Sequence, residues 1–138
     1  MLQKIRNKLN KKGFTLVELI VVLVILAILA ALLIPALTGY IDKANKEKIV
    51  AETRMVVMAA QTELSQRYGK NDEAFSGMGA TSTSTCNEAL LSEIKTLAEV
   101  QGTITSVTYN GKGTVVEVKY GTCTYTAASG SNPVDYLL

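Results

Sequence analysis

Hydrophobic residues are distributed along this chain in two distinct patterns. The first is an unbroken run from Leu19 to Leu37, nineteen residues with neither a charge nor a hydroxyl, which Phe14 extends upstream. A bilayer core of ~30 Å takes about 20 helical residues, so the run is long enough to span a membrane as a helix. It exceeds the ~7–15 residues of a signal-peptide hydrophobic region, and no small-residue cleavage site follows it, so we expect a retained segment.

The second pattern begins after Leu37, where apolar residues recur at helical spacings of seven and four. These residues form one stripe, which Val57 broadens: Ile49, Val56, Ala60, Leu64 and Tyr68. Such a stripe is typical of a helix with one buried face. We therefore predict one helix over residues 15–68, stopped by Gly69, with its apolar stripe turned toward a small sheet.

A second, shorter helix is predicted downstream. The segment Thr85-Cys86-Asn87-Glu88 has the spacing of a capping box, and apolar residues continue at helical intervals after it. We expect this helix to run from Asn87 to Glu99 and to be ended by Gly102. Residues 70–86 are rich in glycine, serine and threonine and are predicted to form a surface loop.

Three β-favouring runs follow, at residues 103–109, 114–120 and 122–127. The Asn110-Gly111 pair between the first two is a strong hairpin signal. Three antiparallel strands would cover the amphipathic half of the long helix, although such a sheet would not be stable alone. The elements predict an α+β fold: a long N-terminal helix packed against a small antiparallel β-sheet, with a short second helix.

Charge is distributed unevenly along the chain. Residues 1–13 carry five basic side chains and no acid, whereas the remaining residues carry nine basic and twelve acidic side chains. By the positive-inside tendency, the N-terminus stays in the cytoplasm and the rest of the chain faces outward. The acidic balance outside the first segment argues against a nucleic-acid binder on bulk charge.

The composition excludes several kinds of chemistry. There is no histidine, which rules out histidine general-base catalysis and histidine metal ligation. The acids after residue 70 are scattered and show no calcium-loop spacing. We therefore expect no catalytic constellation, no metal site and no cofactor, and we expect that the protein is not an enzyme.

Two cysteines, Cys86 and Cys123, would lie outside the cytoplasm by the topology argument, where disulfides persist. We expect them to form a disulfide, with two reduced thiols as the alternative. The bridge would tie the start of the second helix to the last strand. On the chain-entropy model it would stabilise the fold by ~4 kcal/mol.

The junction Lys11-Lys12-Gly13-Phe14-Thr15-Leu16-Val17-Glu18 resembles the class III signal of type IV pilins and pseudopilins. The resemblance implies that a prepilin peptidase cuts between Gly13 and Phe14 and then N-methylates Phe14. Glycine suits a cleavage site because it lets extended backbone approach a protease closely. The resemblance covers about residues 11–40.

Glu18 and Pro35 are the candidate assembly residues. A lone carboxylate at bilayer depth costs ~3 kcal/mol or more. Cleavage creates an α-ammonium at Phe14, which can pair with Glu18 in the same or a neighbouring subunit and reduce that cost; the alternative is an unpaired interfacial acid. Pilins commonly carry a helix-disturbing proline where Pro35 falls, and local melting there on assembly is implied, with a tolerated kink as the alternative.

The resemblance divides the chain into four segments. Residues 1–13 would be a cleaved leader, 14–38 a transmembrane and filament-core helix, 39–69 the amphipathic half of that helix, and 70–138 the globular pilin head. The precursor is expected in the cytoplasmic membrane and the mature subunit in an extracellular pilus at the cell surface.

The leading hypothesis is a structural subunit of a type IV pilus. It would polymerise with itself through its N-terminal helix, assembled by a membrane platform and an ATPase, for adhesion, motility or DNA uptake; direct nucleic-acid binding is left open. The alternative within the family is a pseudopilin of a type II secretion or competence system. The alternative of another class is a monomeric, signal-anchored binding module or small envelope enzyme.

Overall fold

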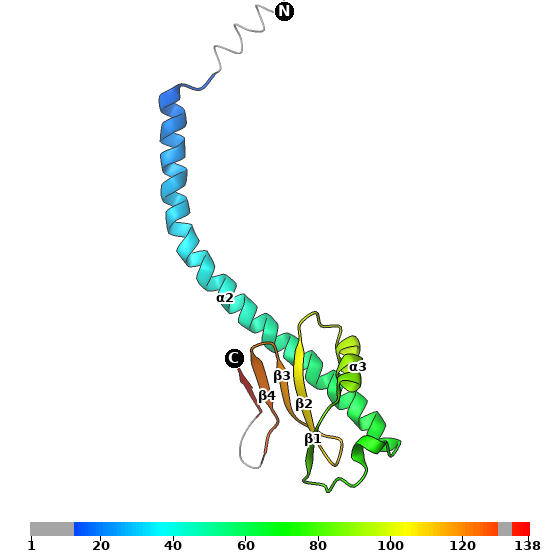
Figure 1. Cartoon of the computed structure of the whole chain (residues 1–138). Helices are drawn as coiled ribbons and strands as arrows, with labels where there is room; N and C mark the ends of the chain where they lie inside the picture. Colours follow the sequence, from blue (N-terminus) through cyan, green and yellow to red (C-terminus); the bar gives the residue numbers. More distant parts are fainter. Residues whose placement is uncertain (1–12, 130–133) are drawn as a thin grey trace, which may run out of the picture. The chain divides into compact units, whose positions relative to one another are not determined.

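The computed structural model describes residues 13–129 and 134–138. Its longest element is the α-helix α2, Leu16–Gly69, which is 54 residues long and continues through Pro35 (Figure 1). The prediction of one helix over residues 15–68 is therefore confirmed to within one residue at each end. Arg67, a cation in the last turn, complements the partial negative charge of the helix C-terminus.

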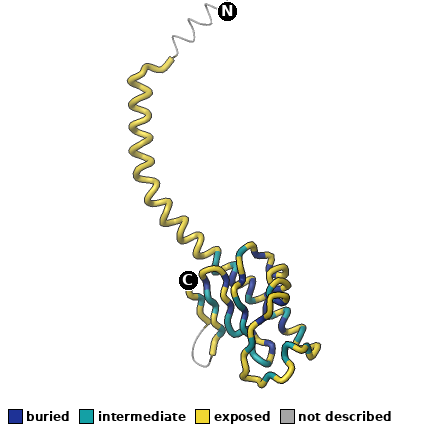
Figure 2. Tube along the Cα trace, viewed as in Figure 1, coloured by how far each residue is buried: buried dark blue, intermediate teal, exposed yellow. Residues whose placement is uncertain are grey.

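The chain divides into two units, Met1–Asp42 and Lys43–Leu138. In the first unit, every described residue is exposed, including the large aliphatic side chains of α2 (Figure 2). In the second unit, buried side chains from α2, the sheet and a short helix form one hydrophobic core. The two halves of α2 thus differ in what surrounds them, as the two hydrophobic patterns predict.

The second unit contains one antiparallel sheet of five strands in sequence order. The strands are β1 (Thr83–Thr85), β2 (Ile104–Asn110), β3 (Val115–Tyr120), β4 (Cys123–Thr126) and β5 (Asp135–Leu137). The three central strands confirm the predicted ones. The edge strands β1 and β5 were not predicted, because each has only three residues and β1 lies in a segment without apolar alternation.

The β2–β3 hairpin confirms the signal at Asn110-Gly111, with Val107 paired opposite Val118. The turn is closed by a 3.0 Å hydrogen bond from the Gly113 amide to the Asn110 carbonyl. Gly113 has a φ of 74°, and a β-carbon there would lie 2.9 Å from Cβ of Tyr68. Glycine is therefore required both for the left-handed turn and for the close approach of the hairpin to α2.

The core face of α2 includes the predicted residues Val56, Ala60 and Leu64, all fully buried. Tyr68 departs from the predicted stripe, since its side chain is 48% exposed. Thr53 joins the core although it is polar, because its hydroxyl donates a 2.7 Å hydrogen bond to the Ile49 carbonyl. The helix therefore satisfies this buried polar group internally.

The short helix α3 spans Glu88–Ala98. Its N-cap is Asn87, whose side-chain oxygen accepts a 2.9 Å hydrogen bond from the Leu90 amide. The predicted capping box from Thr85 to Glu88 is wrong, since Thr85 belongs to β1. The predicted range from Asn87 to Glu99 is confirmed to within one residue at each end. The helix is terminated by Glu99, which adopts the left-handed conformation, and not by Gly102 as predicted.

The predicted loop over residues 70–86 is also more ordered than expected. It contains the 3-10 helix η1, Glu73–Phe75, whose N-cap Asp72 accepts a hydrogen bond from the Ala74 amide. Phe75 makes edge contacts with the rings of Tyr68 and Tyr109. The fold is α+β and pilin-like: a long apolar N-terminal helix, a second short helix and a small antiparallel sheet, as predicted.

Candidate functional site

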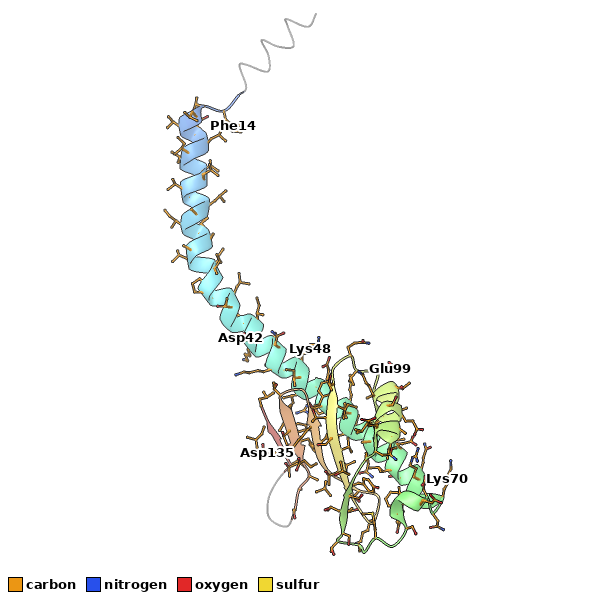
Figure 3. The ribbon with its side chains drawn as sticks, viewed as in Figure 1. Phe14, Asp42, Lys48, Lys70, Glu99 and Asp135 are labelled. Carbon is orange, nitrogen blue, oxygen red and sulfur yellow. The ribbon has the colours of Figure 1, made fainter. Side chains whose placement is uncertain are left out.

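The N-terminal junction, where the apolar run begins, is the first part of the candidate site. Gly13, Phe14 and Thr15 precede α2, lack helical structure and are exposed. Figure 3 labels Phe14 just ahead of the first helical turn, and its side chain is 80% exposed. Exposed backbone outside secondary structure is the kind of substrate that proteases cleave. The peptide bond between Gly13 and Phe14 is therefore accessible.

Thr15 and Glu18 form a reciprocal capping box at the start of α2. The Thr15 amide donates a 3.0 Å hydrogen bond to Oε2 of Glu18. The Glu18 amide in turn donates a 3.2 Å hydrogen bond to the hydroxyl of Thr15. Thr15 is thus the N-cap and Glu18 the third helical residue, an arrangement that satisfies two helix-terminal amides.

This box gives the Glu18 carboxylate a partner before any processing occurs. It lies at the N-terminus of α2, where the helix dipole favours negative charge. The ammonium at Phe14 was the one partner predicted for Glu18, and the box was not predicted, although the Thr-x-x-Glu spacing from Thr15 to Glu18 is a local signal for it. The carboxylate is held one residue from the Phe14 nitrogen, because its hydrogen bond is to the amide of Thr15.

The apolar half of α2 is the second part of the candidate site. Its aliphatic side chains project outward all around the helix (Figure 3), and those from Leu16 to Ile41 are each at least half exposed. Among the described residues, α2 is the one helix long and apolar enough to cross a membrane, with a mean hydropathy of 3.3 over its best window. Length and composition therefore fit a membrane-anchored precursor.

Pro35 lies inside this apolar half without ending the helix. Proline lacks an amide hydrogen, so the carbonyl four residues earlier, that of Ala31, loses its helical partner. One turn later, the Thr38 hydroxyl donates a 2.9 Å hydrogen bond to the Pro35 carbonyl. The helix thus carries a local weakness at Pro35 in the middle of an otherwise regular segment.

The sheet is attached to α2 by polar contacts that the sequence did not indicate. The Gln61 side-chain amide donates a 2.9 Å hydrogen bond to the Gly113 carbonyl and accepts a 3.0 Å hydrogen bond from the Val115 amide. Gln61 therefore pairs with the start of β3 as a neighbouring strand would. A glutamine on a helix gives no sequence signal for such a distant backbone partner.

A second attachment involves Tyr120 on β3, which is almost fully buried. Its hydroxyl donates a 2.8 Å hydrogen bond to Glu52 of α2 and accepts one of 2.8 Å from the Gly102 amide. Burial, and then the hydrogen bond to Glu52, raise the pKa of Tyr120 above its usual value. The hydroxyl therefore stays protonated, and keeps donating, to a higher pH than that of an ordinary tyrosine.

Cys86 and Cys123 are free, buried thiols in the structure, so the expected disulfide is corrected. Cys86 directly follows β1, and its amide donates a 2.8 Å hydrogen bond to the Val107 carbonyl of β2. Cys123 lies on β4, and β2 and β3 intervene. Three strand spacings amount to ~14 Å, whereas a disulfide requires α-carbons within ~7 Å. Burial raises the pKa of Cys86 to about 12.

Within residues 13–129 and 134–138, no group of three or more acids and cysteines could hold a metal ion. Three open surface hollows of the head are lined by residues of α2, of α3 and the cap that follows it, and by Leu138. The described structure thus concentrates its distinctive features at the N-terminal junction and along the apolar half of α2.

Comparison with known proteins identifies the same region. The family model described as the prokaryotic N-terminal methylation motif matches residues 8–34. No curated protein and no solved structure matches the chain. Residues 8–34 carry the class III signal of type IV pilins, and this motif supports a pilin- or pseudopilin-like precursor of the kind that a prepilin peptidase processes.

Proposed function

We propose that the chain is the structural subunit of a type IV pilus. A prepilin peptidase would remove residues 1–13 as a leader by cutting between Gly13 and Phe14, and would N-methylate Phe14. The mature subunit would then polymerise through α2, with an assembly platform and an ATPase at the cytoplasmic membrane. The observation that carries this proposal is the methylation motif at the start of a helix whose apolar half is exposed on every side.

The capping box supports a defined role for Glu18 in this proposal. Cleavage after Gly13 leaves Thr15 and Glu18 intact, so the cap survives processing. It also turns the Phe14 nitrogen into an ammonium, adjacent to the amide that already holds the Glu18 carboxylate. The two charges can then pair within one subunit, or Glu18 can take the ammonium of a neighbour. Pairing lowers the cost of both charges in an apolar surrounding.

The exposed apolar helix supports polymerisation as the fate of the subunit. In the precursor, lipid would cover residues 14–38. In a filament, the same side chains from other subunits would replace lipid, at little cost in apolar burial. Local melting at Pro35, where one helical hydrogen bond is already absent, would let the helix adapt to that packing. The head, residues 70–138 with the amphipathic half of α2, would form the filament surface.

Mass spectrometry of the mature protein tests the processing step. Purified from surface-sheared filaments, the chain should begin at Phe14 and carry one added methyl group. A mature chain that still begins at Met1, or that begins at another residue, would contradict the proposal. Gly13→Ala provides a matched comparison, since it retains the charges and apolar run but reduces the backbone freedom at the scissile bond.

Deletion of the encoding gene tests the pilus assignment itself. The expected result is that the long surface filaments are lost and that adhesion, twitching motility or DNA uptake is lost with them. Loss of protein secretion or transformation without any loss of filaments would instead assign the chain as a pseudopilin. Neither phenotype would be expected for a monomeric, signal-anchored module.

A further inference from the structure

An exposed apolar groove runs between α2 and α3 in the head. It has a volume of about 300 Å³ and is lined by Met55, Met58, Ala59, Thr62, Leu97 and Ala98. The three largest of these side chains, Met55, Met58 and Leu97, are each more than half exposed. Single exposed apolar residues are ordinary, but a group that lines one groove marks a contact surface. Methionine adapts well to such contacts because it is unbranched and polarizable.

The α3 side of this groove is acidic. A neighbouring hollow shares Leu97 and is lined by Glu93 and Glu99 as well; Figure 3 labels Glu99 at the end of α3. Glu93 is paired with Arg67, but that guanidinium also pairs with Glu63 and Asp72, each at 3.0 Å. Arg67 is thus shared among three carboxylates, and Glu99 forms no salt bridge within the described residues.

A second surface hollow, at the start of the head, has the opposite charge. It has a volume of about 410 Å³, and its lining includes the cations Lys43, Lys46 and Arg54 and the acid Glu47. Its floor is apolar, with Val50 of α2 and Leu138. The guanidinium carbon of Arg54 lies 5.2 Å from the centroid of the Tyr136 ring, which holds this cation at the rim.

The charges of the head follow the same division. Residues 43–54 contain four basic and two acidic side chains, whereas residues 55–99 contain three basic and six acidic ones. The head is thus basic where α2 enters it and acidic beyond that point. The hollow at the start of the head has three cations and one acid around an apolar floor, and the apolar groove is flanked by Glu93 and Glu99, so the two are complementary in charge.

We propose that the basic hollow of one copy of this chain docks on the acidic groove of the next copy. Lys43 and Lys46 would meet the Glu93 and Glu99 rim, while the Met58 and Leu97 side chains cover apolar surface. This inference rests on the proposed function and specifies how the heads contact each other. The charges would set the register of the contact more than its strength.

This contact joins two different surfaces, so it is heterologous. The first residues of the two hollows on α2, Lys43 and Met55, are twelve residues apart, which is about 18 Å at 1.5 Å per residue. Each copy added therefore leaves one basic and one acidic surface free. Such an interface does not close into a two-fold dimer, and it grows into an open helical assembly unless the rotation between copies closes a ring.

Cysteine cross-linking in cells tests the contact. In the full-length chain carrying Lys46→Cys and Met58→Cys together, a short bis-maleimide should produce a ladder of dimers, trimers and larger species. Each single variant should give dimers at most, since neither hollow meets its own kind. The native thiols should stay silent, because Cys86 and Cys123 are both buried. The matched control pairs Met58→Cys with Lys112→Cys, an exposed position on the β2–β3 turn, and should give no ladder.

Charge reversal gives an independent measurement. Lys43→Glu with Lys46→Glu should lower filament yield at least tenfold at low salt, and Glu99→Lys should restore part of it. Arginine at both lysine positions should leave the yield unchanged. The head contact alone would be overturned if the wild-type chain forms filaments but the Lys46→Cys, Met58→Cys chain gives no ladder. An equal ladder from the chain with Met58→Cys and Lys112→Cys would overturn it too. A wild-type chain that forms no filaments would overturn the proposed function as well.

Discussion

The two halves of α2 are the most informative comparison within this molecule. From Leu16 to Ile41, its large apolar side chains are exposed on every face; from Thr53 to Leu64, one face is buried under the sheet and α3. Burial of apolar surface contributes about 25 cal/mol per Å². The second half gains this stabilisation within its own chain, whereas the apolar surface of the first half is left uncovered by the described residues. One helix thus combines a half that packs in the core of the head with a half whose apolar surface is exposed.

The largest expected effect is a difference in the free energy of unfolding between two leucine substitutions, one in each half of α2. Leu64 is fully buried and Leu26 is 56% exposed. Leu64→Ala should lower the free energy of unfolding of the head by ~2–5 kcal/mol, because it leaves a cavity. Leu26→Ala should change it by less than ~0.5 kcal/mol. Thermal unfolding in detergent, followed by the near-ultraviolet tyrosine signal, measures both. Equal effects would remove the distinction between the halves.

The next largest loss of stability is expected when the hydrogen bonds between α2 and the sheet are removed. Gln61→Ala removes the only side chain that pairs with both the Gly113 carbonyl and the Val115 amide in the described structure. Leaving these groups unpaired should cost ~1–3 kcal/mol, detected in the same unfolding experiment. Gln61→Glu keeps one acceptor for Val115 and should lose less. A loss for Gln61→Ala no larger than that for Gln66→Ala, an exposed neighbour, would contradict this role.

A smaller effect distinguishes the two candidate caps of α3. Asn87→Ala should cost ~1 kcal/mol, since Asn87 caps the helix, while Thr85→Ala should cost only a few tenths. Helical circular dichroism and the unfolding midpoint report both changes. If Thr85→Ala proved the more damaging substitution, the capping box expected from the sequence would be restored.

A last effect, absent at neutral pH, is a dependence of stability on pH within the head. The pKa of Cys86 is raised to about 12 by burial, above that of an unfolded thiol. The folded chain therefore binds more protons than the unfolded chain above pH ~9, and the stability falls as the pH rises from there toward 12. Cys86→Ala should show a shallower loss of melting temperature between pH 8 and 11. An unchanged slope would indicate that the thiol is not shielded.

Much of this fold could be predicted from the sequence, and the reasons for success are local. The helix over residues 16–69 follows from periodicity sustained over many turns, and the β2–β3 hairpin from Asn110-Gly111. The edge strands β1 and β5 escaped prediction because three residues carry too little pattern. The N-cap of α3 depends on strand pairing. Thr85 and Asn87 are both favourable N-cap residues, but Thr85 is paired with β2 as part of β1, so Asn87 is the N-cap.

The candidate site was predicted in part. The motif around Gly13, Phe14 and Glu18 could be recognised because the junction is contiguous in sequence, and the roles of these residues stay predictions. The separation of the two free thiols could not be predicted, since the distance between Cys86 and Cys123 depends on the strand order, which cysteine spacing does not encode. The capping role of Glu18 was not predicted, because its carboxylate was assigned to an ion pair with the Phe14 ammonium. The spacing from Thr15 to Glu18 was nevertheless a local signal for the capping box.

The central claim is that Glu18 acts through its charge toward the Phe14 ammonium and not only through its cap. Glu18→Gln isolates the charge, because glutamine also serves as the third residue of a capping box. Filament yield of Glu18→Gln and Glu18→Ala, compared at equal amounts of membrane-inserted, processed protein, is the direct measurement. Our account predicts that both variants lose filaments and keep membrane insertion. Normal filaments from Glu18→Gln would contradict it, because the cap alone would then be sufficient.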